Sequence, residues 1–275
     1  MHLAACVEPG DKRIRQLLRD YQPAELIKRP QLLPNTYAAR VHEISMKEIT
    51  QSMTLSHCDF VTVSDDDWPV QLNDLGDVAP LGLWVRGNRQ ALLMPAVSMV
   101  GSRTCTVYGE EVAVEMAARI AQTHIAVVSG GAFGIDAAAH RGALTVGGST
   151  VCVLAGGVDV PYPRAHAVLF DRICNQGLLV SESPPRTSAM KYRFLVRNRL
   201  IAAWGKATVV VEARVRSGAI STASHAGTLG RDVMAVPGLI NNAAAAGCHA
   251  LIRDGAILVT GAADVVESFS TDAST

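Results

Sequence analysis

Four short segments of the chain combine glycine with hydroxyl, arginine or aspartate side chains, and each follows a run of apolar residues. The residues of interest in them are Gly101, Ser102, Arg103, Ser129, Gly130, Gly131, Gly134, Gly156, Gly157, Ser217 and Gly218. Glycine lets a backbone approach a phosphate closely, while hydroxyl groups and the free N–H groups of helix N-termini donate hydrogen bonds to it. Tight packing alone would explain the glycines of any single segment, but the set of four favours a polyanion ligand.

Basic residues are concentrated in one stretch of a chain whose formal net charge is zero. Residues 186–231 contain nine of the 25 Lys and Arg residues and only one of the 25 acids, Glu212. Most of these cations are arginines, whose forked guanidinium suits phosphate contacts. The distribution favours a localised anion-binding surface, with an ordinary solvated basic face as the alternative.

A predicted helix near residues 192–204 carries Arg193, Arg197 and Arg199 in its first turns. Each cation near a helix N-terminus opposes the macrodipole by about 0.3–1 kcal/mol at an exposed site. On a helical wheel these arginines also share an arc with the apolar residues expected in the core. The arrangement calls for an anionic partner, either a phosphate chain or, for Arg199, an internal acid such as Glu182 or Glu212.

Several common kinds of site are excluded or disfavoured by spacing. The chain lacks a dinucleotide-binding Gly-x-Gly-x-x-Gly followed by an acid, a Gly-Lys-Ser/Thr phosphate loop and a Gly-x-Ser-x-Gly nucleophile turn. The six cysteines form no Cys-x-x-Cys pair and are predicted to be small core residues, so no metal site and no cofactor are expected. Without a secretory start or an apolar run of about 18 residues, the sequence predicts a soluble, cytoplasmic protein without a membrane role.

From residue 96 onward, short apolar runs alternate with amphipathic stretches, which predicts a parallel sheet covered by helices on both faces. Strands are expected at 60–63, 81–86, 97–100, 125–129, 150–154, 178–181, 208–211, 233–236 and 257–259. Helices are expected near 107–122, 134–146, 163–175, 192–204 and 218–229. Right-handed crossovers place all strand-to-helix turns at one edge of such a sheet, where open α/β sheets bind ligands.

The chain is predicted to divide into a helical N-terminal domain at 1–56, an α/β domain at 57–268 and a flexible tail at 269–275. Proline residues separate the expected short helices at 11–19, 24–28 and 37–49. Three successive aspartates, at 65–67, are predicted to form a solvated turn. The fold class is therefore α/β, an extended Rossmann-like domain preceded by a small helical domain.

Six motifs occur in the order found in the DNA-processing protein A (DprA/Smf) family, which this chain resembles over residues 60–260. They begin at Val100, Ser129, Val153, Arg197, Val210 and Gly230. The resemblance implies an extended Rossmann-like domain, with a helical domain similar to a SAM domain before it. It also implies single-stranded-DNA binding without catalysis, loading of the RecA recombinase in natural transformation, and a homodimer.

By motif position, the resemblance assigns phosphate contacts to Arg103, Arg164, Arg197, Asn198 and Arg199, beside the glycine turns and with Lys191 as a further candidate. Three residues depart from the family pattern, one of them His249, which occupies the position of an Asn. His166 occupies the position of an Asn, and Arg186 occupies the position of a Gly. The alternative function is a phosphoribohydrolase-like Rossmann enzyme that hydrolyses nucleotides, although no glutamate follows the Ser217 turn to act on a sugar.

Overall fold

The computed structural model describes residues 1–270. Its first part is a module of five helices: α1 (His2–Cys6), α2 (Lys12–Asp20), α3 (Pro23–Lys28), α4 (Asn35–Glu43) and α5 (Met46–Ser56). The carboxylate of Asp11 caps α2 by accepting a hydrogen bond from the backbone N–H of Arg13. Leu3, Ile14, Leu26 and Tyr37 form the centre of a separate small core. The helical N-terminal part predicted from the sequence is therefore present.

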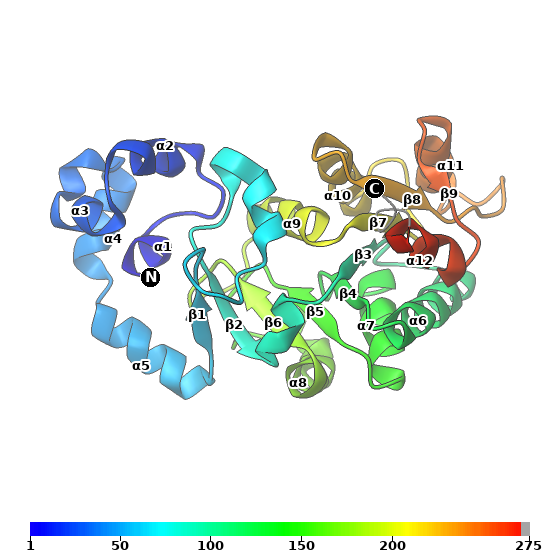
Figure 1. Cartoon of the computed structure of the whole chain (residues 1–275), viewed down its shortest axis with the longest axis horizontal. Coiled ribbons are helices and arrows are strands. Elements are labelled where there is room, and N and C mark those ends of the chain that lie inside the picture. Colours follow the sequence, from blue (N-terminus) through cyan, green and yellow to red (C-terminus); the bar gives the residue numbers. More distant parts are fainter. Residues whose placement is uncertain (271–275) are drawn as a thin grey trace.

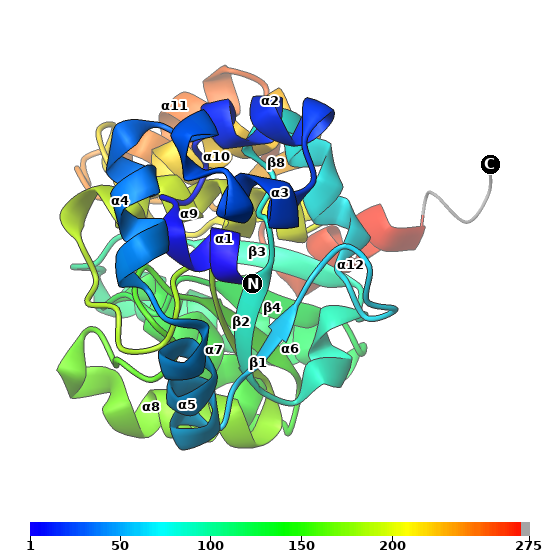
Figure 2. The same cartoon turned by 90° about the vertical axis from the view of Figure 1, so that its left-hand side faces the viewer.

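Two details of this module differ from the prediction. The single helix expected at 37–49 is two helices, because Ile44 and Ser45 have extended backbone and Ser45 occupies the N-cap position of α5. Helix α1 was not predicted, since five residues are too few to show a helical period. Figure 2 looks onto the module and shows α5 running away from the other helices, along the side of the sheet that carries β1.

A nine-stranded sheet follows, in the order β1-β2-β6-β5-β4-β3-β7-β8-β9. The strands are β1 (Asp59–Val61), β2 (Leu83–Gly87), β3 (Ala96–Val100), β4 (Ala126–Ser129), β5 (Thr150–Val153), β6 (Leu178–Ser181), β7 (Ala207–Val210), β8 (Asp232–Ala235) and β9 (Ile257–Leu258). β1 and β2 pair antiparallel, and all pairs from β6 to β9 are parallel. The extended Rossmann-like prediction is confirmed.

Helices cover both faces of the sheet (Figure 1). They are α6 (Val107–Gln122), α7 (Ile135–Thr145), α8 (Ala167–Gln176), α9 (Lys191–Trp204), α10 (Gly218–Thr228), α11 (Ala246–Arg253) and α12 (Ala262–Ser270). One core layer includes Val128 with Leu200 and Trp204 of α9. Another joins Val127 to Met116 and Ile120 of α6. Alternate residues of β4 thus face opposite layers, as strand geometry requires.

The end of the chain departs from the prediction. Helices α11 and α12 were not predicted, and α12 includes residues 269 and 270, which the sequence assigned to a flexible tail. The remainder of that predicted tail, 271–275, lies outside the described residues. Within residues 1–270, no helix is long and apolar enough to cross a membrane.

Candidate nucleic-acid interface

A pocket of about 720 Å³ opens at the carboxyl edge of the parallel strands. It is lined by turns that follow β3, β4, β5 and β7, together with the first turns of α9 and α10. Eight of the residues predicted from the sequence line it: Gly101, Ser102, Arg103, Lys191, Arg197, Asn198, Ser217 and Gly218. Residues separated by more than a hundred positions therefore meet at this edge of the sheet.

Hydrogen bonds between neighbouring turns hold the pocket wall. The backbone N–H of Ser102 donates to the carbonyl oxygen of Glu212 at 2.7 Å, and the N–H of Ile135 donates to the carbonyl of Ser102 at 3.1 Å. Gly134 has a φ of +73°, and a Cβ there would lie 2.2 Å from the Ser102 carbonyl oxygen. Glycine is therefore required at this position both for its backbone conformation and for the close approach of the two turns.

Arg197 lies at the bottom of the pocket and is only 6% exposed. Its Nη1 donates to the carbonyl of Gly130 at 2.7 Å and also to that of Val153. A Cβ on Gly130 would lie 2.2 Å from Nη1, so this glycine makes room for the guanidinium. Burial lowers the pKa of Arg197, and nearby Asp136 opposes that shift. An arginine nonetheless stays charged in proteins, so the pocket floor carries a fixed positive charge.

Asp136 is the one acid among the residues that line this pocket. It is 6% exposed and accepts a hydrogen bond from the backbone N–H of Ala132 at 3.4 Å. Burial raises the pKa of Asp136, although the charge of Arg197 acts in the opposite direction. The carboxylate thus lies beside Arg197 beneath the surface.

Four further cations line the pocket and are exposed: Arg103, Lys191, Arg214 and Arg216. Within residues 1–270, none of their side chains forms an ion pair with an acid. Arg214 and Arg216 were not among the predicted site residues. Their signal was present in the sequence, because both precede the Ser217 turn inside the basic stretch.

Aromatic side chains accompany these cations. Phe194 lines the pocket, with the guanidinium carbons of Arg103 and Arg197 at 5.5 and 5.9 Å from its ring centroid. Tyr162 is 53% exposed, and its ring centroid lies 5.3 Å from that of Phe194. Cations within about 6 Å of a ring are attracted by its negative face. The pocket therefore offers π surfaces beside positive charge.

The structure corrects the prediction for Arg199, because this residue does not line the pocket. Its guanidinium donates to both carboxylate oxygens of Glu182, at 2.6 and 2.7 Å, and to the carbonyl of Val78. Two residues along a helix are about 200° apart around its axis, so Arg197 and Arg199 point to different sides of α9. The internal acid pairing that the sequence left open for Arg199 is the one found.

The remaining predicted residues lie around the pocket or outside it. Ser129 is buried and donates to the Met99 carbonyl at 2.6 Å. Gly130, Gly131 and Gly134 shape the turn after β4 without being among the lining residues. Arg164 is also outside the lining and lies exposed on a short turn of 3-10 helix. These residues lie at the expected edge of the sheet without lining the pocket, and their predicted contacts to nucleic acid stay predictions.

His166 supports the same turn. Its Nδ1 lies 3.1 Å from the carbonyl oxygen of Gly131, to which the ring N–H donates, and its ring packs edge-on against Phe133. The departure from the family pattern at this position thus retains a polar contact to the turn.

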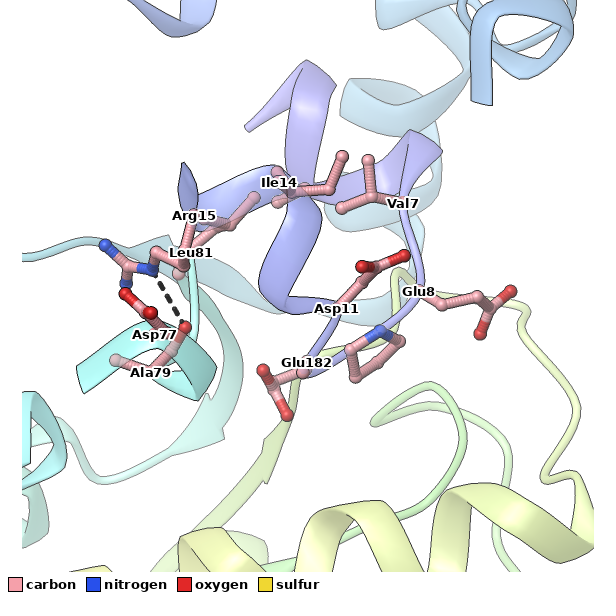
Figure 3. Close-up of a pocket in the computed structure, with 13 residues that line it drawn as sticks. Val7, Glu8, Asp11, Ile14, Arg15, Asp77, Ala79, Leu81 and Glu182 are labelled. Atoms are coloured by element: carbon pink, nitrogen blue, oxygen red, sulfur yellow. Dashed lines mark hydrogen bonds between the residues drawn. The ribbon is translucent and has the colours of Figure 1, made fainter. Parts of the chain in front are cut away.

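The opposite side of α9 contacts the helical module. Glu8 accepts hydrogen bonds from Tyr192, Arg193 and Arg40. In Figure 3, Glu8 projects from the loop that leads to α2, Glu182 lies beside that loop, and Arg15 extends toward Ala79. Nε of Arg15 donates to the Ala79 carbonyl at 3.1 Å. Arg193 and Arg199, the two cations of α9 that do not line the pocket, are therefore paired with acids at this junction.

The described residues contain no group of three or more His, Cys, Asp and Glu side chains placed to hold a metal ion. Burial raises the pKa of the Cys6 and Cys248 thiols to about 11, which keeps both protonated at neutral pH. Four of the six cysteines expected in the core, Cys6, Cys58, Cys152 and Cys248, are buried, whereas Cys105 and Cys174 are only partly buried.

Comparison with known proteins identifies the family. A profile described as "DNA recombination-mediator protein A" matches residues 59–270. The DNA processing protein DprA of Mycobacterium tuberculosis is 50% identical over 219 residues, covering 75% of this chain and 56% of the relative. The DNA processing protein DprA of Streptococcus pneumoniae is 42% identical over 208 residues, covering 76% and 73%. The chain thus spans little more than half the length of the mycobacterial relative.

Comparison with solved structures identifies the same family. DNA processing protein A from Streptococcus pneumoniae superposes with a TM-score of 0.85 at 32% identity, covering 97% of this chain and 95% of that one. DNA processing protein A from Helicobacter pylori, whose structure was described for its single-stranded DNA binding mode, gives a TM-score of 0.70 at 26% identity, covering 79% and 98%. The chain belongs to the DNA recombination-mediator protein A family, also named DprA or Smf.

Proposed function

We propose that this protein binds single-stranded DNA in the pocket at the carboxyl edge of its sheet. The observation that carries the proposal is the charge of the lining: Arg103, Lys191, Arg197, Arg214 and Arg216 surround a single buried acid. All of these cations except Arg197 are exposed and lack an ion-pair partner within residues 1–270, and several phosphates in a row would match them most simply. The single-stranded DNA binding mode described for the Helicobacter pylori relative supports the same ligand.

Unpartnered polar atoms in the lining support an anionic ligand. Within the described chain, Nε of Arg197 and Oγ of Ser217 are buried and have no hydrogen-bond partner. Buried polar groups are almost always hydrogen-bonded. Ser217 and Gly218 also stand at the N-terminus of α10, where free backbone N–H groups attract anions. A phosphate oxygen would satisfy these donors.

The aromatic rings favour a single strand over a duplex. In single-stranded DNA the bases are free to stack on protein rings, and this contributes about 1–3 kcal/mol per base with little dependence on sequence. Phe194 and Tyr162 offer such rings beside the cations. Two other exposed aromatic residues are already engaged, because Phe133 packs on His166 and the hydroxyl of Tyr192 donates to Glu8.

The proposal includes the absence of catalysis. Asp136, the one acid among the described lining residues, is buried, and the charge of Arg197 acts on it. A nucleotide-hydrolysing enzyme would need a carboxylate placed to act on the sugar. Incubation with nucleoside monophosphates should release no base above a protein-free control, and steady release would overturn this part of the proposal.

We extend the proposal, on family resemblance, to RecA loading by a homodimer in the cytoplasm during natural transformation. Strand β9, last in the order of the described sheet, leaves Ile257 and Leu258 about half exposed. An open apolar edge is suited to covering by a second copy. Light scattering should give twice the chain mass, and RecA should assemble faster on DNA that carries this protein.

Binding to labelled oligonucleotides over a salt series tests the central claim. If about four phosphates are neutralised, the logarithm of the affinity should fall against the logarithm of salt with a slope near −3, since each contributes roughly 0.7 for single strands. Single strands should bind more tightly than the matching duplex, whatever their base sequence. Equal affinity for duplex, or a slope near zero, would contradict the proposal.

A further inference from the structure

A second pocket, of about 350 Å³, lies where the helical module meets the sheet. Its walls come from α5, from β2 and from the loops that follow β5 and β6. The lining residues are Ser52, Leu55, Ser56, Arg86, Asp159 and Arg186. Two arginines, two serines and an exposed leucine thus face one hollow, outside the pocket already described.

Both arginines of this second pocket lack a protein partner. Arg86 is half-buried and Arg186 is exposed, and within residues 1–270 neither guanidinium forms a hydrogen bond or an ion pair. The acid that lines the pocket is already engaged. Asp159 accepts the backbone N–H of Arg186 at 2.8 Å and the Ser56 hydroxyl at 3.0 Å, one on each oxygen. Asp159 therefore fixes the loop without forming an ion pair to either guanidinium, and its single negative charge offsets only part of the positive charge of the two arginines.

The backbone at Arg186 points to a role for its side chain. Arg186 has a φ of +67°, in the left-handed region that glycine adopts freely and that a residue with a Cβ occupies at a cost. The family pattern has Gly at this position. An unfavourable conformation held by an arginine that lacks a partner is a basis for inferring function. Folding alone would be better served by glycine.

The two pockets share their connecting loops. The loop after β5 supplies Asp159 to the second pocket and Tyr162 to the first, and the loop after β6 supplies Arg186 to the second and Ala189 to the first. Lys191 of the first pocket is five residues from Arg186, so their Cα atoms lie within about 18 Å of each other. A strand that leaves the first pocket needs only a few nucleotides to reach the second.

We propose that Arg86 and Arg186 form a second phosphate subsite, which holds a single strand after it leaves the pocket at the sheet edge. The inference rests on the proposed function of the first pocket. The guanidinium groups contact phosphate oxygens, the hydroxyl group of Ser52 adds a hydrogen-bond donor, and the side chain of Leu55, which is 69% exposed, gives a base an apolar surface.

Arg186→Gly tests the subsite without disturbing the fold, because glycine suits the backbone there. Its melting temperature should equal or exceed that of the parent protein. Binding should be measured with oligonucleotides of about 5 and about 15 nucleotides, near the two ends of the usual range of site sizes. The variant should bind the short oligonucleotide normally and the long one about tenfold more weakly, with a salt slope reduced by about 0.7.

Two further variants separate local contact from overall charge. Arg186→Lys keeps the cation and should retain most of the affinity for the long oligonucleotide. Arg119→Ala removes one cation from α6, where Arg119 pairs with the exposed Glu115. It should leave both affinities unchanged. An equal loss in Arg119→Ala and Arg186→Gly would mean that net charge alone acts, and the subsite would be refuted.

The remaining outcomes distinguish the sources of phosphate and the two proposals. If Arg186→Gly loses binding of inorganic pyrophosphate but keeps the affinity for the long oligonucleotide, the site takes a free anion and the extended strand path is wrong. If the parent protein binds neither oligonucleotide, the proposed function itself fails. If it binds both and Arg186→Gly matches it throughout, only the second subsite is refuted.

Discussion

Helix α9 carries basic residues on two sides, and the two sides differ in whether those residues are paired with acids. On the side of the sheet edge, Lys191 and Arg197 line an open pocket and form no ion pair with any carboxylate of residues 1–270. On the side of the helical module, Arg193 pairs with Glu8 at 3.0 Å and Arg199 pairs with Glu182 at 2.6 Å. Arginine thus stabilises the fold through ion pairs on one side of α9, and on the other side it is available to bind a ligand.

The difference teaches that local density of arginine does not identify a binding site. What separates the two sides is whether the fold supplies an acid. Glu8 lies 185 positions from Arg193 and Glu182 lies 17 positions from Arg199, and both reach the junction with the helical module. Where no acid is supplied, positive charge stays exposed to solvent or is held by carbonyl groups, as for Arg197.

The largest effect is expected on the paired side. Glu182→Ala leaves the buried guanidinium of Arg199 without its carboxylate, and breaking a buried pair in this way costs about 3–5 kcal/mol of unfolding free energy. Urea denaturation measures the loss. Glu115→Ala, which breaks a pair whose side chains are 67% and 65% exposed, is the control and should cost under about 1 kcal/mol. Similar losses in the two variants would mean that the Glu182 pair is no different from a surface pair.

On the open side, Arg103→Ala should weaken single-stranded-DNA binding by about 10- to 100-fold, since a hydrogen bond to a charged group contributes about 1.5–3 kcal/mol. The loss should be the same for all base sequences, and the unfolding free energy should change little because the Arg103 side chain is exposed. Arg193→Ala is the matched variant from the paired side. It should lower stability more than affinity, and the reverse result would break the comparison.

A smaller, pH-dependent effect is expected at Glu8. Burial acts to raise its pKa, but hydrogen bonds from Tyr192 and Arg40 and the charge of Arg193 bring it below the ordinary value of 4.5. A lowered folded pKa gives stability that is present above about pH 4.5 and lost as the pH falls below it. Glu8→Gln should therefore melt at a lower temperature than the parent at pH 7, with a difference that shrinks toward pH 3.

The size of the Glu8 effect is limited by solvent, because its side chain is 21% exposed. Screening keeps it at about 1 kcal/mol or less, which corresponds to a shift in melting temperature of about 2–4 °C. Thermal melts of both proteins at pH 7, 5 and 3 measure it. A difference that stays constant over this range would mean that the ionised form of Glu8 adds no stability.

Much of the fold could be predicted because its strands are continuous apolar runs. All nine expected strands are present, with ends shifted by one or two residues, and the five helices expected between 107 and 229 are also found. Helices α11 and α12 escaped prediction. They have only eight and nine residues, too few for a helical period to stand out from the sequence.

The site was predictable to the level of loops but not of side-chain direction. Topology brings the Gly101 and Ser217 turns together, and this follows from strand order. Whether Arg197 or Arg199 faces the pocket depends on which carboxylate is placed next to α9, and Glu182 reaches Arg199 only through the tertiary fold. Spacing along one helix cannot contain that information.

The pairing of β3 with β7 has a consequence for how the protein acquires activity during folding. Ser98 pairs with Thr208, so the turn that carries Arg103 and the turn that carries Arg216 meet only after the chain has closed a loop of about 110 residues. Contacts of such high sequence separation slow folding. Affinity for the ligand should therefore emerge at the last step, when the parallel sheet is complete, and recovery of binding after dilution from denaturant reports on that step alone.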